Sequence, residues 1–232
     1  MKEYPKITVC LTSCGRHDLL ERTLESFFKY NTYPIEDFMW SEDADIPQLE
    51  GFLRQWDGIN FNVEHRLDKK YNYDKPISFF YGKVGQIKSI DRMYSTVTTP
   101  YIFHLEDDWL FTRPSFVEKS LEIMESHPEI LQVHLREQND LNGHPVIYDN
   151  EQYGILEHGK TRWHGFSLNP SLKRLSDYKL INGGYAAVGH EVNLSEWYNE
   201  RGFIAAITKQ GYVRHIGQNR TVKDILRNTK PI

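Results

Sequence analysis

The sequence predicts an α/β fold with a mostly parallel central sheet flanked by helices. Short runs rich in β-branched and aromatic residues alternate with segments whose apolar residues recur at helical spacing, in four successive units over residues 7–135. Such alternation favours a parallel sheet. Residues 136–185 break the alternation with Gly, Pro, Asn and His throughout. There we expect loops and hairpins that form a smaller antiparallel subregion.

The first unit begins with residues 7–12, a β-rich run that predicts a strand. The loop 13–17, Ser-Cys-Gly-Arg-His, has turn-like composition. Leucines and phenylalanines at helical spacing predict a helix over 19–28. Asp18 and Glu21, three apart at its front, indicate a capping box in which Asp replaces Ser or Thr.

The second and third units contain a long irregular stretch. Residues 35–40 predict a strand and 47–56 a helix, and 61–65 alternate as a third strand. Residues 68–82 are rich in Lys, Tyr, Asn and Asp, so we expect a long loop. Apolar residues at helical spacing over 84–97 predict the third helix.

The fourth unit starts with a strand over 101–105 that runs directly into three acidic residues. Pro114 marks a helix start, because proline suits the first turn, and the helix is expected to reach about Ser126. Residues 130–135 predict the fifth strand. We expect a single domain over 1–232, divided functionally near residue 110.

Composition excludes several classes of protein. Hydrophobic residues make up 39% of the 232 residues and charged residues 26%, which supports a sizeable core rather than intrinsic disorder. The net charge of −4 argues against a generally basic nucleic-acid binder. Residues from 209 onward carry +5 and residues 1–208 carry −9. This basic C-terminal tail could fold over an anionic ligand, or it could be a solvated terminus.

Cysteine content and hydropathy predict the compartment. Cys10 and Cys14 are too few for a disulfide scaffold and are expected to be reduced. The apolar run near the N-terminus is short for a signal peptide, and no stretch approaches the roughly 20 residues of a membrane span. We therefore expect a cytoplasmic protein without a membrane span.

The acidic triplet Glu106-Asp107-Asp108 is the strongest candidate site. In open α/β sheets, ligands bind beyond the carboxyl ends of strands, where this triplet is expected to lie. Adjacent carboxylates repel each other unless a positive group sits among them. A divalent cation meets that requirement and commonly bridges to phosphates. A solvated strand-to-loop junction is the alternative.

Other strand ends carry residues suited to an anionic ligand. Arg16 precedes the first helix, whose N-terminal N–H groups favour anions, although a solvent-exposed arginine in an ordinary turn is equally compatible. Neither a dinucleotide fingerprint nor a P-loop is present. Acids in 41–45 could accept hydrogen bonds from a base or ribose, or could cap a helix. Lys83 and Lys88 flank the start of the third helix and could meet a diphosphate or remain solvated.

Together these parts resemble glycosyltransferases of the GT-A fold, most closely the small family-two type. The similarity covers the Ser- and Arg-bearing loop, the acidic loop after strand two, the Gly-x-x-Lys helix start and the Glu-Asp-Asp strand end, over about residues 6–110. It is weaker over 166–172, 183–191 and 212–217. The resemblance implies a nucleotide-sugar-binding half over 1–110 and an acceptor-side half over 111–232.

The resemblance also implies roles for individual residues. The triplet corresponds to the family's "DxD" motif, with Glu in place of the first Asp, so Asp108 is the expected ligand of Mn²⁺ or Mg²⁺. His215, in a short β-like run, can complete the metal shell, although a lone histidine is more often structural. The expected nucleotide-sugar-binding residues are Thr12, Arg16, Asp43, Lys88, Glu106 and Asp107.

An inverting transfer needs a general base, and Glu191 is the candidate. It opens an amphipathic helix after a run of small residues, the position of the base in similar enzymes, although helix capping explains it equally well. Glu196 is the second choice. Trp109, Trp163 and Tyr185 could stack on sugars, with core packing as the alternative for each.

The sequence thus predicts a metal-dependent glycosyltransferase that moves a sugar from a nucleoside-diphosphate sugar to an acceptor hydroxyl, with inversion favoured. The acceptor could be a glycan, a lipid carrier, a protein or a nucleic acid. A metal-dependent nucleotidyltransferase is one alternative, but the loop 13–17 is short and has a single glycine. A non-catalytic nucleotide- or carbohydrate-binding protein is the other.

Overall fold

A computed structural model of the chain describes residues 4–44, 65–66, 71, 73 and 75–218. The helix predicted over 47–56 and most of the strand predicted over 61–65 lie outside the described residues, as does the tail beyond 218. Among the described residues, no helix has the length and apolar character needed to cross a membrane.

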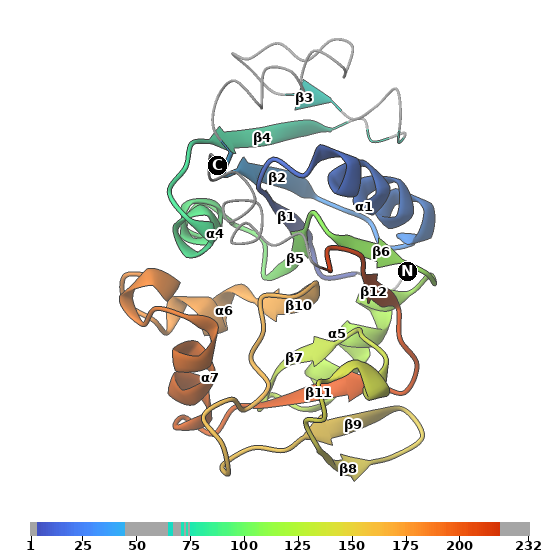
Figure 1. Cartoon of the computed structure of the whole chain (residues 1–232), viewed down its shortest axis with the longest axis vertical. Helices are drawn as coiled ribbons and strands as arrows, with labels where there is room; N and C mark the ends of the chain where they lie inside the picture. The colour runs from blue at the N-terminus through green and yellow to red at the C-terminus, as the bar shows by residue number, and fades with distance from the viewer. Residues whose placement is uncertain (1–3, 45–64, 67–70, 72, 74, 219–232) are drawn as a thin grey trace, which may run out of the picture.

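The larger of the two main sheets has six strands and lies in the upper part of Figure 1. Its order is β10-β5-β1-β2-β4-β3, and β5, β1, β2 and β4 run parallel to one another. The edge strands β10 and β3 are antiparallel to their neighbours. This confirms the predicted mostly parallel sheet. The bounds are β1 Ile7–Ser13, β2 Asp37–Glu42, β3 His65–Arg66, β4 Pro76–Tyr81, β5 Tyr101–Glu106 and β10 Ser171–Arg174.

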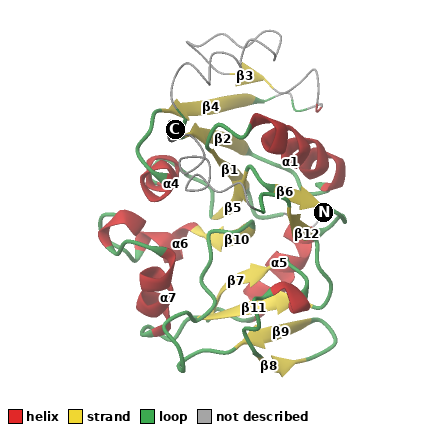
Figure 2. Cartoon of the chain, in the orientation of Figure 1, coloured by secondary structure: helices red, strands yellow, loops and turns green. Residues whose placement is uncertain are grey.

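Helices α1 (His17–Tyr30) and α4 (Gln86–Tyr94) lie on opposite sides of this sheet (Figure 2). The alternation of β1 explains this arrangement, because successive side chains point to opposite faces. Val9 packs in the apolar cluster that contains the α1 face, whereas the neighbouring Cys10 packs in the cluster that contains the α4 face. Both faces of the sheet are therefore buried, as parallel sheets require.

A second sheet of four strands, in the order β7-β11-β9-β8, forms the smaller subregion. The β8–β9 hairpin and the β9–β11 pair are antiparallel, while β7 and β11 are parallel. The bounds are β7 Ile130–His134, β8 Val146–Asp149, β9 Tyr153–Leu156 and β11 Ile204–Thr208. The helices of this half are α5 Phe116–Ser126, α6 Leu175–Lys179 and α7 Glu191–Asn199, with short 3₁₀ turns at Gln138–Asp140 and Tyr185–Ala187.

Strand β6 (Trp109–Phe111) follows the acidic triplet and pairs with β12 (Val213–His215) in a two-stranded antiparallel ribbon. The hydroxyl of Thr23 in α1 accepts a hydrogen bond from the Trp109 amide at 3.1 Å, which fixes the ribbon against the helix. This pairing places β12, which lies more than 100 residues later in the chain, beside the segment that follows β5.

Two local predictions were wrong. The expected loop 68–82 contains β4, because Ile77 and its aromatic neighbours pair in parallel with β2 and pack on the sheet. The capping box is not formed, since α1 begins at His17 with Arg16 as its N-cap and Asp18 lies inside the first turn. The fifth predicted strand is present as β7, which belongs to the second sheet.

Candidate functional site

The candidate residues meet at the carboxyl ends of three neighbouring strands. In the parallel register, Ser13 at the end of β1 lies opposite Glu42 at the end of β2. Thr12 lies opposite Glu106, the last residue of β5. The loops that leave these strands therefore begin side by side, as the sequence predicted for a ligand site at this sheet edge.

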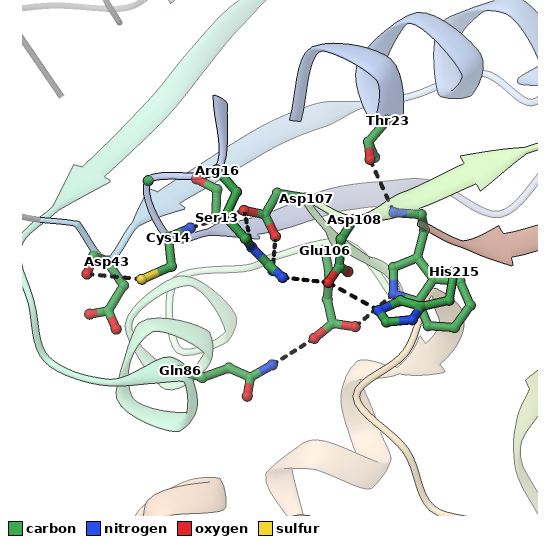
Figure 3. Close-up of polar contacts among 12 residues, drawn as sticks. Ser13, Cys14, Arg16, Thr23, Asp43, Gln86, Glu106, Asp107, Asp108 and His215 are labelled. Atoms are coloured by element: carbon green, nitrogen blue, oxygen red, sulfur yellow. Dashed lines mark hydrogen bonds and ion pairs between the residues drawn. The ribbon is translucent and has the colours of Figure 1, made fainter. Parts of the chain in front are cut away.

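Arg16 supplies the positive charge that the acidic triplet requires (Figure 3). Its Nη1 donates to Asp108 Oδ2 at 2.6 Å, and its Nε donates to Asp107 Oδ2 at 3.3 Å. Nη2 donates to the other oxygen of Asp107, so this pair is bidentate. The backbone N–H of Cys14 adds a hydrogen bond to Asp107 Oδ2 at 3.2 Å. All three charged side chains are largely buried, with exposed fractions of 11%, 1% and 8% for Arg16, Asp107 and Asp108.

Burial and neighbouring charge give the two aspartates different acidities. Loss of hydration raises the pKa of Asp107 to about 6, even though Arg16 opposes this shift. Burial acts in the same direction on Asp108, but hydrogen bonds from His215 and Arg16 outweigh it and lower its pKa. Asp108 is consequently the member of the triplet whose charged form is most stabilised.

His215 approaches Asp108 from the opposite side to Arg16 (Figure 3). Its Nε2 lies 3.1 Å from Asp108 Oδ2, and its ring packs on Trp109 with centroids 4.9 Å apart. The Ile216 N–H donates to the Asp108 carbonyl at 2.8 Å. A Cβ at Gly217 would overlap the Asp108 carboxylate, so only glycine allows this close backbone approach.

Glu106 faces away from Arg16 and is held by two donors. Gln86 Nε2 donates to Oε1 at 2.6 Å and Trp109 Nε1 donates to Oε2 at 3.0 Å. Loss of hydration raises the pKa of Glu106 well above its ordinary value, and the charges of Asp108 and Glu191 add to this effect. The influence of Glu191 means that the predicted base lies near the triplet.

The other predicted nucleotide-binding residues differ in their surroundings. Thr12 is buried at the end of β1 beside the triplet. Asp43 accepts hydrogen bonds from the N–H groups of Val84 at 2.6 Å and Gly85 at 2.9 Å, so it fixes the loop at the start of α4. Lys88 is exposed on α4, and in the part of the chain that the structure describes no hydrogen bond or ion pair joins it to the triplet.

The sequence did not single out Glu42, which organises this edge of the sheet. Its buried carboxylate accepts hydrogen bonds from Ser13 Oγ at 2.6 Å, from the Gly15 N–H at 2.9 Å and from the Ala44 N–H at 3.0 Å. Burial raises its pKa to about 7. Because these donors come from both loops, Glu42 ties the Arg16 loop to the loop after β2. Its position as the last residue of an apolar strand was the available signal.

Glu191 lies at the first residue of α7 and lines a cleft of about 570 Å³. The N–H of Leu168 donates to its Oε2 at 3.3 Å. Burial raises the pKa of Glu191, although the Leu168 hydrogen bond and the charge of Lys173 oppose the shift. A carboxylate with a raised pKa at the wall of a cleft is suited to accept a proton. Most other residues lining the cleft are polar, and they include His134, Arg136, His144, Ser167 and Asn169.

The remaining predicted site residues, Glu196, Tyr185 and Trp163, lie in different surroundings. Glu196 forms a surface ion pair with Arg162 at 3.0 Å. Tyr185 is buried among aromatic residues, as the packing alternative predicted. Trp163 lines the same cleft as Glu191, and its Nε1 donates to the Phe166 carbonyl at 2.7 Å. Of Glu196, Tyr185 and Trp163, only Trp163 lines the cleft that contains Glu191.

No protein-family model and no curated protein matches this sequence. Solved structures do match the fold. A mannosyltransferase from Pyrobaculum calidifontis, PcManGT, in complex with GDP-Man and Mn²⁺, aligns with a TM-score of 0.63 at 13% identity. The chain has the GT-A fold. This alignment covers 91% of the chain but 59% of the mannosyltransferase, so the chain spans about three fifths of that protein's length.

TarS from S. aureus shares the GT-A fold with this chain. Its residues 1–349 in complex with UDP align with a TM-score of 0.59 at 9% identity over 90% of this chain and 59% of that one. The complex with UDP-GlcNAc gives 0.57 at 10% identity over 93% and 62%. At these identities the similarity establishes the GT-A fold, and the roles of the side chains follow from this chain's own geometry.

The carboxylate of Asp108 and the imidazole of His215 are side chains that can bind a divalent ion. Within the described residues, no three His, Cys, Asp or Glu side chains form a complete metal site. Asp108 Oδ2 and His215 Nε2 lie 3.1 Å apart, so the two side chains would be able to hold one ion between them. Such a pair would leave the other positions of the ion to phosphate oxygens and water. Arg16 shares the same Asp108 oxygen.

Proposed function

We propose that the protein is a glycosyltransferase that moves a sugar from a nucleoside-diphosphate sugar to an acceptor hydroxyl. One observation carries the proposal: three chain segments bring Arg16, the Asp107-Asp108 pair and His215 together at the carboxyl ends of the parallel strands. Glu191, which lines the cleft, lies near enough to Glu106 for its charge to raise the pKa of that carboxyl. The site thus pairs a place for a diphosphate with a place for an acceptor.

The donor would lie across the ends of β1, β2 and β5. Thr12 and Arg16 would border the nucleotide, with Asp107 holding the arginine in place. Glu106 and Asp43 offer carboxylate oxygens to the ribose and base, and Lys88 on α4 offers charge to the diphosphate. Arg16 presents a fork of donors suited to phosphate oxygens. Released from Asp108, its Nη1 can donate to the departing diphosphate while Nε and Nη2 remain on Asp107.

Asp108 and His215 would hold the Mn²⁺ or Mg²⁺ ion. When bound, the ion neutralises charge on the leaving diphosphate. Mn²⁺ suits the pair better, because imidazole is a more natural ligand for Mn²⁺ than for Mg²⁺. Gly217 packs against the Asp108 carboxylate, and a side chain at this position would clash with the proposed ligand.

Glu191 would act as the general base from the wall of the cleft. Its carboxylate takes the proton of the acceptor hydroxyl as that oxygen forms a bond to the anomeric carbon. The bond from this carbon to the diphosphate oxygen breaks, and the nucleoside diphosphate leaves with the electron pair. A base on the face opposite the leaving group produces inversion, which is the stereochemistry we propose.

Titration calorimetry tests the donor site first. UDP, GDP and CMP are titrated with and without Mn²⁺, and we expect at least one diphosphate to bind about tenfold or more tightly with the metal. Asp108→Asn should abolish this difference. Asp37→Asn, an exposed aspartate at the far end of β2, is the matched control. Equal binding with and without Mn²⁺, or an unchanged Asp108→Asn variant, would contradict the proposed metal site.

Turnover distinguishes the proposal from its alternatives. A panel of nucleotide sugars is incubated with the protein and Mn²⁺, and release of nucleoside diphosphate is measured. Release of pyrophosphate from nucleoside triphosphates would instead indicate a nucleotidyltransferase. Tight binding without turnover, unaffected by Glu191→Gln, would indicate a binding protein.

A further inference from the structure

Lys173 is a buried cation that the proposed reaction leaves without a role. It lies on the edge strand β10, opposite Ile102 of β5, and is 3% exposed. Lysine is almost never fully buried unless it is paired, because removing an ammonium group from water is costly. Its position therefore needs a compensating set of contacts.

Two hydrogen bonds and an aromatic ring hold the ammonium group. Nζ donates to Gln132 Oε1 and to the Ser167 carbonyl, both at 2.8 Å. It also lies 4.7 Å from the centroid of the Phe166 ring. These acceptors are neutral, so they satisfy the donors of the lysine without balancing its charge.

Two carboxylates from separate elements favour the charged form of Lys173. Burial lowers the pKa of Lys173 to about 7, and the negative charges of Glu191 and Glu106 oppose this shift. Among the described residues, His104 on β5 and His134 on β7 also respond to the charge of Lys173. Burial, together with the lysine charge, lowers their pKa values to about 3 and 4, so both imidazoles are neutral at physiological pH.

A short strap, residues 166–168, links Lys173 directly to the proposed base. The Ser167 carbonyl accepts from Lys173, and the Ser167 N–H donates to the same glutamine oxygen that the lysine contacts, at 3.2 Å. The next N–H, that of Leu168, donates to Glu191 Oε2 at 3.3 Å. The ammonium group and the base are thus connected through consecutive backbone groups.

The strap is also tied to the helix that carries the base. Ser195 Oγ in α7 accepts hydrogen bonds from the N–H groups of His164 at 2.7 Å and Phe166 at 3.2 Å. With the lysine at one end and α7 at the other, the strap has a fixed position relative to Glu191. A fixed donor orients the carboxylate that it contacts.

We propose that Lys173 is a positioning residue for the transfer reaction, which keeps the Glu191 carboxylate ionised and, through the strap, holds it in place at the cleft. The proposal rests on the proposed role of Glu191 as base. Lys173 neither donates nor accepts the transferred proton. It favours the charged form of Glu191 by opposite charge, as an ammonium group does for a nearby carboxylate.

A titration that does not depend on activity tests the electrostatic part. The protein is labelled with ¹³C at the glutamate carboxyl carbon, and the Glu191 signal is assigned by its loss in Glu191→Gln. We expect Lys173→Met to move the midpoint of this signal upward by about one pH unit, the size of effect expected for loss of an opposite charge. Lys179→Met, the same substitution at an exposed lysine six residues later, should leave it unchanged. An unmoved midpoint in Lys173→Met overturns the proposal.

A turnover assay tests whether Lys173 acts on the reaction through Glu191. It uses a nucleotide sugar that the wild-type protein hydrolyses. Lys173→Met should move the acid limb of the pH profile upward and lower kcat by up to about tenfold on that limb, because a one-unit shift changes the ionised fraction up to tenfold. In the Glu191→Gln background the same substitution should change kcat less than about twofold, since the residues act as a unit. Equal losses in both backgrounds would mean a merely structural lysine and would overturn the proposal.

The two proposals fail in different ways. Normal turnover in Glu191→Gln would remove Glu191 as the base, whatever the titration of Lys173→Met gives. Should Lys173→Met fail to fold, Gln132→Glu places a carboxylate against the intact lysine and cancels its charge. We expect this variant to raise the midpoint of Glu191 as well, and a folded Gln132→Glu protein with an unmoved midpoint overturns the role of Lys173.

Discussion

Replacing Arg16 by Met removes the cation that the two buried aspartates share. The wild-type contact is bidentate to Asp107 and single to Asp108, and all three side chains are largely shielded from water. Removing one partner of a buried ion pair costs about 3–5 kcal/mol, because an uncompensated charge remains. For a chain of this size, 1 kcal/mol corresponds to about 2–4 °C in Tm, so we expect a loss of roughly 6–20 °C at pH 7.5.

The pH dependence of this loss identifies its cause. With Arg16 present, the pKa of Asp107 is about 6, above the unfolded value, so the folded state binds the proton more tightly. This aspartate therefore makes stability fall as pH rises from about 4 to 6. Without Arg16 its folded pKa rises further and the fall extends to higher pH. The deficit of Arg16→Met should accordingly be smaller at pH 5, where Asp107 is mostly protonated in both proteins.

Thermal unfolding followed by circular dichroism at pH 5 and 7.5 measures both effects. Arg22→Met, an exposed arginine on the same helix, is the matched control and should change stability by less than about 1 kcal/mol. A Tm for Arg16→Met within 2 °C of wild type at pH 7.5, or a deficit larger at pH 5 than at pH 7.5, would refute the reasoning.

Three further predictions follow from the same region. Gly217→Ala places a methyl group against the Asp108 carboxylate and should cost about 1–3 kcal/mol in urea unfolding while weakening Mn²⁺-dependent nucleotide binding. Glu42→Gln removes a carboxyl whose pKa is about 7, so the decline in stability that wild type shows between about pH 4.5 and 7 should flatten. His215→Ala should weaken Mn²⁺-dependent nucleotide binding about tenfold in calorimetry and leave metal-free binding unchanged. A metal dependence that His215→Ala leaves intact, or an unaltered pH slope in Glu42→Gln, would count against these assignments.

Local sequence patterns were sufficient for the main parallel sheet and the acidic strand end. The buried strands β1 and β5 read as continuous apolar runs, and the acids that follow β5 must then lie at the sheet edge. The prediction failed for β4, because the turn-forming residues before it obscured a strand whose burial depends on pairing with β2. It also missed Glu42, whose importance comes from donors on two different loops.

What the sequence alone determined is the set of local elements and the chemical character of the strand ends, since both depend on residues close together in the chain. Tertiary structure alone decided which distant side chains contact one another. Asp108 and His215 are 107 positions apart, and only the pairing of β6 with β12 brings them to 3.1 Å. Lys173 gave no signal in the sequence, because a lysine on a short strand is ordinarily exposed. Its burial beside Gln132 and Ser167 results from the packing of β10 between the two sheets, where long-range contacts replace water.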